Sequence, residues 1–107
     1  MPTENHLKML ETAMHEFVQS KGWYEADSPR PQTLRNLAVS LVLEASEVLE
    51  HFQWGEQPKD REEFAAELAD VMLYLLQLAS LSGVDLEQAV LEKLRKNRER
   101  TWDQPGG

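Results

Sequence analysis

Two pairs of carboxylates give this chain its clearest chemical signature. Glu44 and Glu47 form one pair and Glu67 and Asp70 the other, and the two acids of each pair are three residues apart. Residues at positions i and i+3 of a helix project from the same face. Four carboxylates gathered in a site of low dielectric would repel one another unless a cation lay among them. We therefore predict a site for a hard divalent cation, usually Mg²⁺, with Mn²⁺ as the alternative.

Other interpretations of the four acids have to be weighed. Most helical carboxylates are simply solvated, but both pairs lie inside strongly apolar stretches, at residues 37–49 and 64–81. Paired acids on facing helices can also hold two iron ions, yet such sites usually use Glu-x-x-His. No histidine lies three residues after any of the four acids. His15 and His51 stand singly, and we predict that neither is a ligand.

Four amphipathic helices are expected to position these acids. Their expected ranges are residues 4–20, 32 or 33 to 52, 61–81 and 86–100. The N-caps expected for the last three helices are Thr33, Asp60 and Asp85. The predicted fold is all-α, a four-helix bundle that forms a single domain over residues 1–107, with a loose tail from about residue 103.

Composition excludes several classes of function. The formal net charge is −8, with 19 acidic and 11 basic residues, whereas binding to a nucleic acid needs a basic face. The chain has no cysteine, so it can form neither disulfides nor thiolate metal sites. The first residues lack the apolar core of a signal sequence, and the dense apolar run at residues 71–79 is too short to span a bilayer. We expect a cytoplasmic protein that binds no membrane.

The second and third expected helices are apolar around much of their circumference. Residues 37–43 and 71–79 are almost unbroken apolar runs. One four-helix chain would leave part of this surface in water, and self-association is the simplest way to cover it. We therefore expect at least a homodimer, formed largely through these two helices.

Basic and amide side chains on the last expected helix could bind an anionic ligand. Lys93, Asn97 and Arg100 share one stripe of that helix. Taken alone, they are explained equally well as the solvent face of an amphipathic helix. Beside a metal site that handles anions, they become candidate contacts to phosphate and to a nucleobase.

Three aromatic residues could stack on a flat ring. Trp23 and Trp54 each flank a loop next to a helix end, and Tyr74 lies one turn beyond Asp70. Packing in a core or an interface explains all three equally well.

These residues together resemble the MazG-like superfamily of all-α nucleoside triphosphate pyrophosphohydrolases, and above all its single-domain dCTP pyrophosphatase branch. The hallmark of the superfamily is E-x-x-E, a spacer and E-x-x-D, which Glu44, Glu47, Glu67 and Asp70 match. Further stretches that carry the resemblance are residues 35–37, 52–54, 67–75 and 93–100. The resemblance extends over roughly residues 17–102.

The resemblance implies an enzyme that clears unwanted nucleotides by hydrolysing a nucleoside triphosphate to the monophosphate and pyrophosphate. It implies that the four acids hold Mg²⁺ and that the sites are built between the subunits of a homodimer or a homotetramer, a dimer of dimers. The implied contacts to the nucleotide are Tyr74, Lys93, Asn97 and Arg100, with Trp23 and Trp54 lining the base pocket. Among the acids, we choose Glu47 as the group that orients or deprotonates the attacking water.

The chain departs from the dCTP-specific branch between Trp23 and Arg35, where it is several residues longer. Glu25, Ala26 and Asp27 stand where a histidine often follows the tryptophan. These changes fall where the base is expected. The favoured substrate is dCTP or a modified dCTP, while dATP or a broader range stays open. The alternative function is a non-catalytic oligomerisation or regulatory module that retains the fold.

Overall fold

The computed structural model describes residues 6–100, and within that range it contains four helices and no strand. The helices are α1 (His6–Ser20), α2 (Leu34–Glu50), α3 (Arg61–Leu81) and α4 (Leu86–Glu99). The predicted all-α class is confirmed. Trp102 and the tail that we expected to be loose lie outside the described residues.

Local signals set the helix ends where the sequence predicts them. The Thr33 hydroxyl accepts a hydrogen bond from the backbone N–H three residues on, at 3.1 Å. Asp60 accepts from two such groups, at 3.0 and 3.2 Å, and Asp85 from one, at 3.0 Å. These oxygens satisfy N–H groups that have no partner inside their helices. Gly22 and Gly83 follow α1 and α3 with φ angles of 72° and 75°, a left-handed conformation that costs glycine little.

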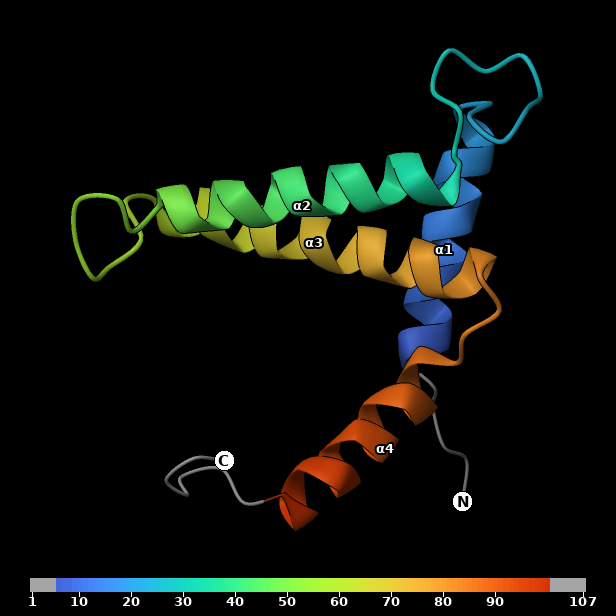
Figure 1. Cartoon of the computed structure of the whole chain (residues 1–107). Helices are drawn as coiled ribbons and strands as arrows, with labels where there is room; N and C mark the ends of the chain where they lie inside the picture. The colour runs from blue at the N-terminus through green and yellow to red at the C-terminus, as the bar shows by residue number, and fades with distance from the viewer. Residues whose placement is uncertain (1–5, 101–107) are drawn as a thin grey trace.

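α3 is the central element, since it contacts each of the other three helices. It runs antiparallel to α2, and α1 crosses one end of this pair (Figure 1). The core lies at that crossing, where Met14 and Val18 of α1 pack against Leu76 of α3. Leu37 of α2 is also buried. The crossing therefore fixes the end of the α2–α3 pair that holds the cavity described below.

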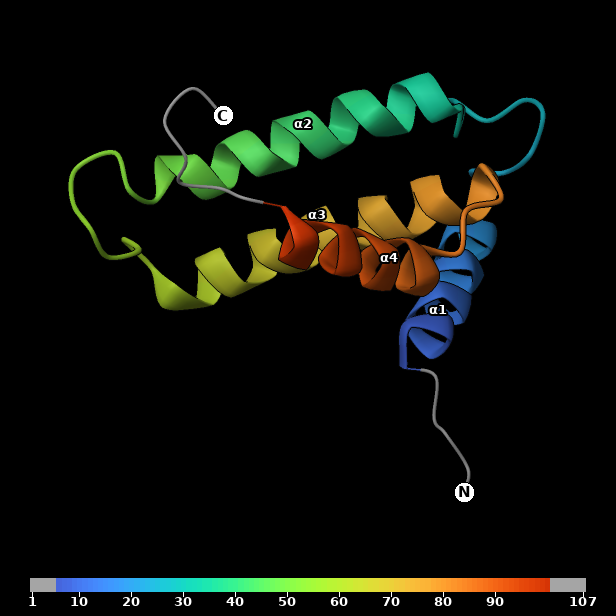
Figure 2. The ribbon, with the colours of Figure 1, turned by 60° about the horizontal axis from the view of Figure 1, so that its bottom comes forward.

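The single chain is more open than a compact domain of its length. Its radius of gyration is 17.1 Å, against about 13 Å for a compact domain of this length. α4 diverges from α3 after the short connection between them (Figure 1) and lies in front of α3 when the bottom of the molecule comes forward (Figure 2). No residue of α4 is buried. Val42, Leu49 and Leu91 are 66%, 71% and 54% exposed. In one chain, these apolar helix faces therefore remain in contact with solvent.

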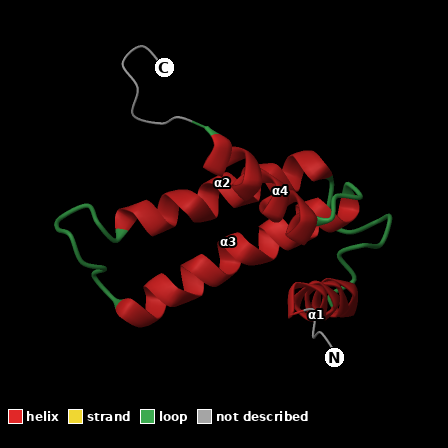
Figure 3. Cartoon of the chain, turned by 90° about the horizontal axis from the view of Figure 1, so that it is seen from below, coloured by secondary structure: helices red, strands yellow, loops and turns green. Residues whose placement is uncertain are grey.

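α3 is also long and apolar enough, by length and composition, to cross a membrane. The apolar segment is thus longer than the run of residues 71–79 on which the sequence-based expectation rested. The core helix of a soluble protein meets the same criterion, so one such helix is weak evidence for a span. In this chain α3 lies between α2 and α1, as the view from below shows (Figure 3), and its acids interact with groups of α2.

Candidate active site

The α2–α3 pair brings the two acidic pairs into electrostatic contact. The pKa of Glu44 is raised, first by burial and then by hydrogen bonding with Glu47 and by the negative charges of Glu47, Asp70 and Glu67. Like charges raise a carboxyl pKa only when they are near in space. The structure therefore places all four predicted ligands around one region between α2 and α3.

The donor set fits a hard divalent cation, although the side chains are not arranged around one. Within residues 6–100, no group of three or more His, Asp or Glu side chains is close enough to hold a metal ion as the rotamers stand. Carboxylate oxygens are nevertheless the ligands such cations prefer, and a cation would relieve the repulsion on Glu44. Glu47 and Asp70 are exposed, so their rotamers can change without disturbing the packing of α2 on α3.

His51 is a member of this site that the sequence analysis missed. It is 4% exposed, and its Nε2 lies 2.6 Å from Oε2 of Glu67. Its Nδ1 is buried and has no hydrogen-bond partner among the described residues. A proton on Nδ1 would have no acceptor, so we assign the proton to Nε2, which donates a hydrogen bond to Glu67. The signal in the sequence was the position of His51 four residues after Glu47, on the same polar stripe.

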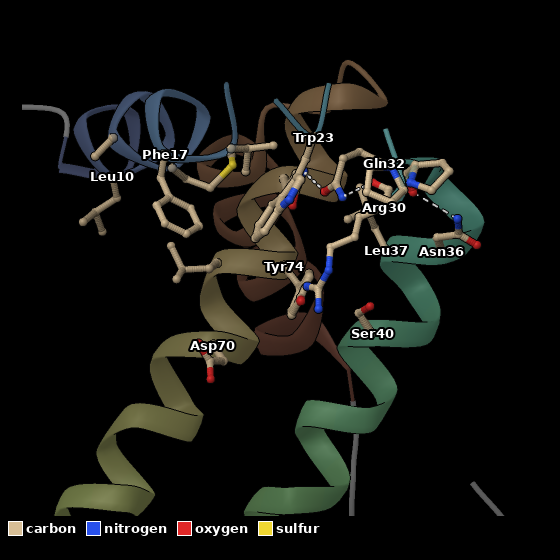
Figure 4. Close-up of a pocket in the computed structure, with 17 residues that line it drawn as sticks. Leu10, Phe17, Trp23, Arg30, Gln32, Asn36, Leu37, Ser40, Asp70 and Tyr74 are labelled. Atoms are coloured by element: carbon tan, nitrogen blue, oxygen red, sulfur yellow. Dashed lines mark hydrogen bonds between the residues drawn. The ribbon is translucent and has the colours of Figure 1, made fainter. Parts of the chain in front are cut away.

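A cavity of about 700 Å³ adjoins the acids at the end of the α2–α3 pair that α1 crosses (Figure 4). Asp70 lines it, and so do the predicted site residues Tyr74 and Trp23. Other residues that line the cavity are the apolar Phe17 and Leu37 and the polar Arg30, Gln32, Asn36, Ser40 and Gln77. Ring faces and a few polar groups beside a carboxylate suit a ligand with a flat ring at one end.

Trp23 is held at the cavity wall by its neighbours. Its ring meets Phe17 edge-on, with centroids 5.6 Å apart. The Arg30 guanidinium lies 5.1 Å from the Trp23 ring centroid, a cation–π contact. Figure 4 shows Arg30 reaching from its loop into the space between Tyr74 and Ser40. Arg30 thus brings a positive charge to the cavity that Asp70 also lines.

Four predicted site residues do not reach this cavity within one chain. Trp54 is 89% exposed and lies in the loop that joins α2 to α3, at the opposite end of that pair (Figure 1). Lys93 and Asn97 lie on α4, and Arg100 directly follows it. None of the four lines the cavity. Any contact of theirs with a ligand there would need another copy of the chain or a movement of α4.

Several cavity residues were not predicted. Gln77 shares the polar stripe of α3 with Asp70 and Tyr74, so the periodicity of α3 could have indicated it. Arg30 and Gln32 belong to the irregular segment between α1 and α2, where no periodicity shows which side chains point inward.

Comparison with known proteins identifies the family. The model of the MazG-like family matches residues 39–104, a span that contains all four acids. The chain belongs to the MazG-like family. It is similar to dCTP pyrophosphatase 1 of Mus musculus and of Homo sapiens, with 38% and 36% identity over 108 residues, covering 92% of this chain. The chain spans 59% of the length of those relatives.

Two further similarities bear on the MazG-like fold and its range of activities. A dATP/dGTP diphosphohydrolase of Cyanophage S-2L is 46% identical over 43 residues, which is 40% of this chain and 41% of that protein. The crystal structure of a pyrophosphatase from Archaeoglobus fulgidus superposes with a TM-score of 0.77 and 32% identity, covering 92% of this chain and 94% of that one. The arrangement of helices is therefore that of a known pyrophosphatase structure.

Repulsion among the acids predicts a stability change that needs no metal. Replacing Glu44 by Gln should raise the melting temperature at pH 7 in EDTA, because burial and neighbouring charges raise the pKa of Glu44. A group with a raised folded pKa contributes stability below its unfolded pKa and loses it as pH rises through the folded value. The gain in melting temperature should therefore shrink as pH falls below the ordinary value of 4.5.

Glu50→Gln is the matched control for this prediction, because Glu50 lies on α2 but is not among the groups that perturb Glu44. It should not reproduce the pH-dependent gain. If Glu44→Gln melted at a lower temperature than the wild type at pH 7 as well as at pH 4, the predicted repulsion on Glu44 would be wrong. Calorimetry between pH 4 and pH 7 measures the effect.

Proposed function

We propose that this protein is a Mg²⁺-dependent nucleoside triphosphate pyrophosphohydrolase that converts a (d)NTP and water into the (d)NMP and pyrophosphate. The observation that carries the proposal is that Asp70 belongs both to the acidic group and to the cavity wall. A site for a hard cation and a pocket for a flat ring therefore adjoin. The names of the similar dCTP pyrophosphatases and of the dATP/dGTP diphosphohydrolase support this choice.

The four acids would hold the metal. When bound, Mg²⁺ neutralises phosphate charge and polarises the phosphorus toward attack by water. Glu47 is exposed, so it can reach a water molecule at the edge of the site, orient it and accept its proton. Glu67 is only 23% exposed and is held by the N–H of His51, which leaves its other oxygen to face the acidic group.

Residues from a second copy of the chain would complete the site. The apolar faces of α2 and α3, and those of α4, remain exposed in one chain. Covering them in a homodimer, or in a homotetramer built as a dimer of dimers, would bring new residues to each cavity. In such an assembly Lys93 and Arg100 would stabilise the charge of the leaving pyrophosphate. Trp54 and Asn97 would then contact the base or the sugar.

The substrate we propose is dCTP or a modified dCTP, cleared from the cytoplasmic nucleotide pool. The Trp23 ring offers a face for the base, and stacking of this kind contributes about 1–3 kcal/mol per base in nucleic-acid sites. Tyr74, on the same wall, lies between Asp70 and the far end of the cavity (Figure 4). The choice of cytosine comes from the similar proteins.

The direct test is release of pyrophosphate from a panel of deoxynucleoside triphosphates with and without Mg²⁺. Glu47→Gln and Asp70→Asn should each lower Mg²⁺-dependent turnover on the order of 100-fold or more, since each removes a group that serves the metal. Glu50→Gln should leave turnover unchanged. Full activity of both site variants would exclude the proposal, and absence of any activity in the wild type would favour the non-catalytic module.

His51 should act as a positioning residue for Glu67. His51→Leu removes the N–H that fixes Glu67, and loss of such a contact typically weakens metal binding about 10- to 100-fold. Mn²⁺ titration followed by electron paramagnetic resonance measures this without any turnover. His51→Gln keeps an N–H donor and should restore much of the affinity.

Phe64→Leu is the packing control for His51, because Phe64 meets the His51 ring at 5.5 Å. It should lower thermal stability without a comparable loss of Mn²⁺ affinity. An unchanged Mn²⁺ affinity in a well-folded His51→Leu variant would refute the positioning role.

Assembly is tested by mass. Light scattering at micromolar concentration should give the mass of a dimer or a tetramer, and interfaces of this obligate kind bury more than about 2,000 Å². Val42→Glu and Leu49→Glu place charges on the exposed apolar face and should lower that mass. Ala26→Glu, in the segment between α1 and α2, is the control that should not. A monomeric wild type would contradict the proposed assembly.

A further inference from the structure

A chain of hydrogen bonds fixes the orientation of one amide at the cavity wall. It begins at the backbone carbonyl of Arg30, which can only accept, so the group facing it at 2.7 Å is the Nε2 of Gln32. The Oε1 of Gln32 therefore points the other way. It accepts from Nε2 of Gln77 at 2.8 Å. The Arg30 carbonyl, which can only accept, therefore fixes the orientation of the Gln77 amide through Gln32 (Figure 4 shows Gln32 and Arg30).

The other end of the chain agrees with this orientation. The second N–H of Gln77 donates to the Tyr24 hydroxyl at 3.2 Å. The Tyr24 hydroxyl also lies 2.6 Å from Nδ1 of His15 and 4.0 Å from Sδ of Met14, and Nε2 of His15 lies 2.7 Å from Ser80 Oγ. Burial raises the pKa of Tyr24, so its hydroxyl stays a neutral phenol whose oxygen accepts from Gln77. Both N–H groups of Gln77 therefore have acceptors, in Gln32 and Tyr24.

Gln77 therefore offers the cavity a carbonyl and nothing else. Both of its N–H hydrogens are used within the chain of hydrogen bonds. The side chain is 3% exposed, yet it lines the cavity. Its Oε1 accepts no hydrogen bond within residues 6–100. Because it is also not among the buried polar atoms that lack a partner, this oxygen keeps some contact with solvent. An acceptor in this position calls for a donor from the ligand.

The position of Gln77 on α3 matches the base end of a nucleotide. Asp70, Tyr74 and Gln77 occur at helical spacing on one stripe. At 1.5 Å per residue, Asp70 and Gln77 are about 10 Å apart along α3. With phosphate near Asp70, the sugar would lie beside Tyr74 and the base beside Trp23. The edge of the base would then meet Gln77.

We infer that Gln77 reads the nucleobase through its carbonyl oxygen, so that the cavity selects bases with an exocyclic amine, cytosine and adenine, over their keto counterparts. This inference rests on the proposed function. An amine at that edge donates an N–H to Oε1. A keto oxygen would place two acceptors against each other and leave both unpaired in a buried site, which is how a hydrogen-bonding pocket rejects an analogue. The chain of hydrogen bonds prevents Gln77 from turning its NH₂ group toward a keto base.

The test compares matched pairs of substrates on the wild-type protein. Each pair, dCTP with dUTP and dATP with dITP, keeps one ring system and replaces the exocyclic amine by a carbonyl. The value of kcat/KM should be about 10- to 100-fold higher for the amine member of both pairs. Equal values, or a preference for the keto members, would overturn the inference.

Gln77→Met removes the carbonyl at similar volume, and the ratio within each pair should fall toward 1 while dCTP is still hydrolysed. Ser80→Ala is the matched control, because it shortens the far end of the chain and leaves Gln77 held by Gln32 and Tyr24; its ratios should stay at the wild-type values. Thermal melts establish that the variants fold. Should Gln77→Met not fold, Gln32→Leu frees the amide to turn over and should lower the same ratios.

Binding of monophosphates separates this inference from the proposed function. Calorimetry should show dCMP binding more tightly than dUMP, whether or not any triphosphate is hydrolysed. This preference without hydrolysis would refute the proposed enzymatic activity and support the role of Gln77. Hydrolysis of all four triphosphates with equal kcat/KM would support the proposed enzymatic activity and refute the role of Gln77. Equal affinities for dCMP and dUMP would refute it as well.

Discussion

Repulsion between the carboxylates of α2 and α3 is the constraint on which the rest of the structure depends. Packing of α2 on α3 partly buries Glu44 and draws it toward the acids of α3. Burial is the largest cause of its raised pKa, followed by Glu47 on the same helix and then by Asp70 and Glu67 of α3. Burial of apolar surface therefore works against charge at the same place. Such tension is common where a site is arranged for a ligand rather than for stability. A cation among the acids would turn the repulsion into attraction.

The core that opposes this repulsion is small and lies to one side. Met14, Val18 and Leu76 form it at the crossing of α1 with the α2–α3 pair, whereas the acids lie toward the middle of that pair. α1 thus anchors α3 at the end where the cavity opens. His51 and Phe64 anchor the opposite end. The core at the α1 crossing and the contact between His51 and Phe64 therefore stabilise the α2–α3 pair on either side of the acids, which themselves pack little apolar surface.

Local rules made much of this structure predictable from sequence. The caps at Thr33, Asp60 and Asp85 depend on neighbours a few residues away, and the stripe that holds the acids depends only on helical periodicity. Periodicity placed His51 on the stripe of the acids, but its contact with Glu67 depends on how α2 packs on α3 and could not be derived from the sequence. The 45-residue separation between Gln32 and Gln77 likewise conceals their hydrogen bond. The divergence of α4 was missed because amphipathicity shows that a helix needs a partner without saying which one.

α3 places Asp70 and Gln77 at a fixed distance from each other along the cavity wall. Because a helix has a fixed rise per residue, the spacing of Asp70 and Gln77 does not depend on the segment between α1 and α2. That segment can change in length without moving the acids. It can, however, decide which acceptor faces Gln77, since Arg30 supplies the carbonyl from which the chain of hydrogen bonds takes its direction. If Gln77 reads the base as proposed, a change in this loop would alter which base is read while the acids on the same helix stay in place.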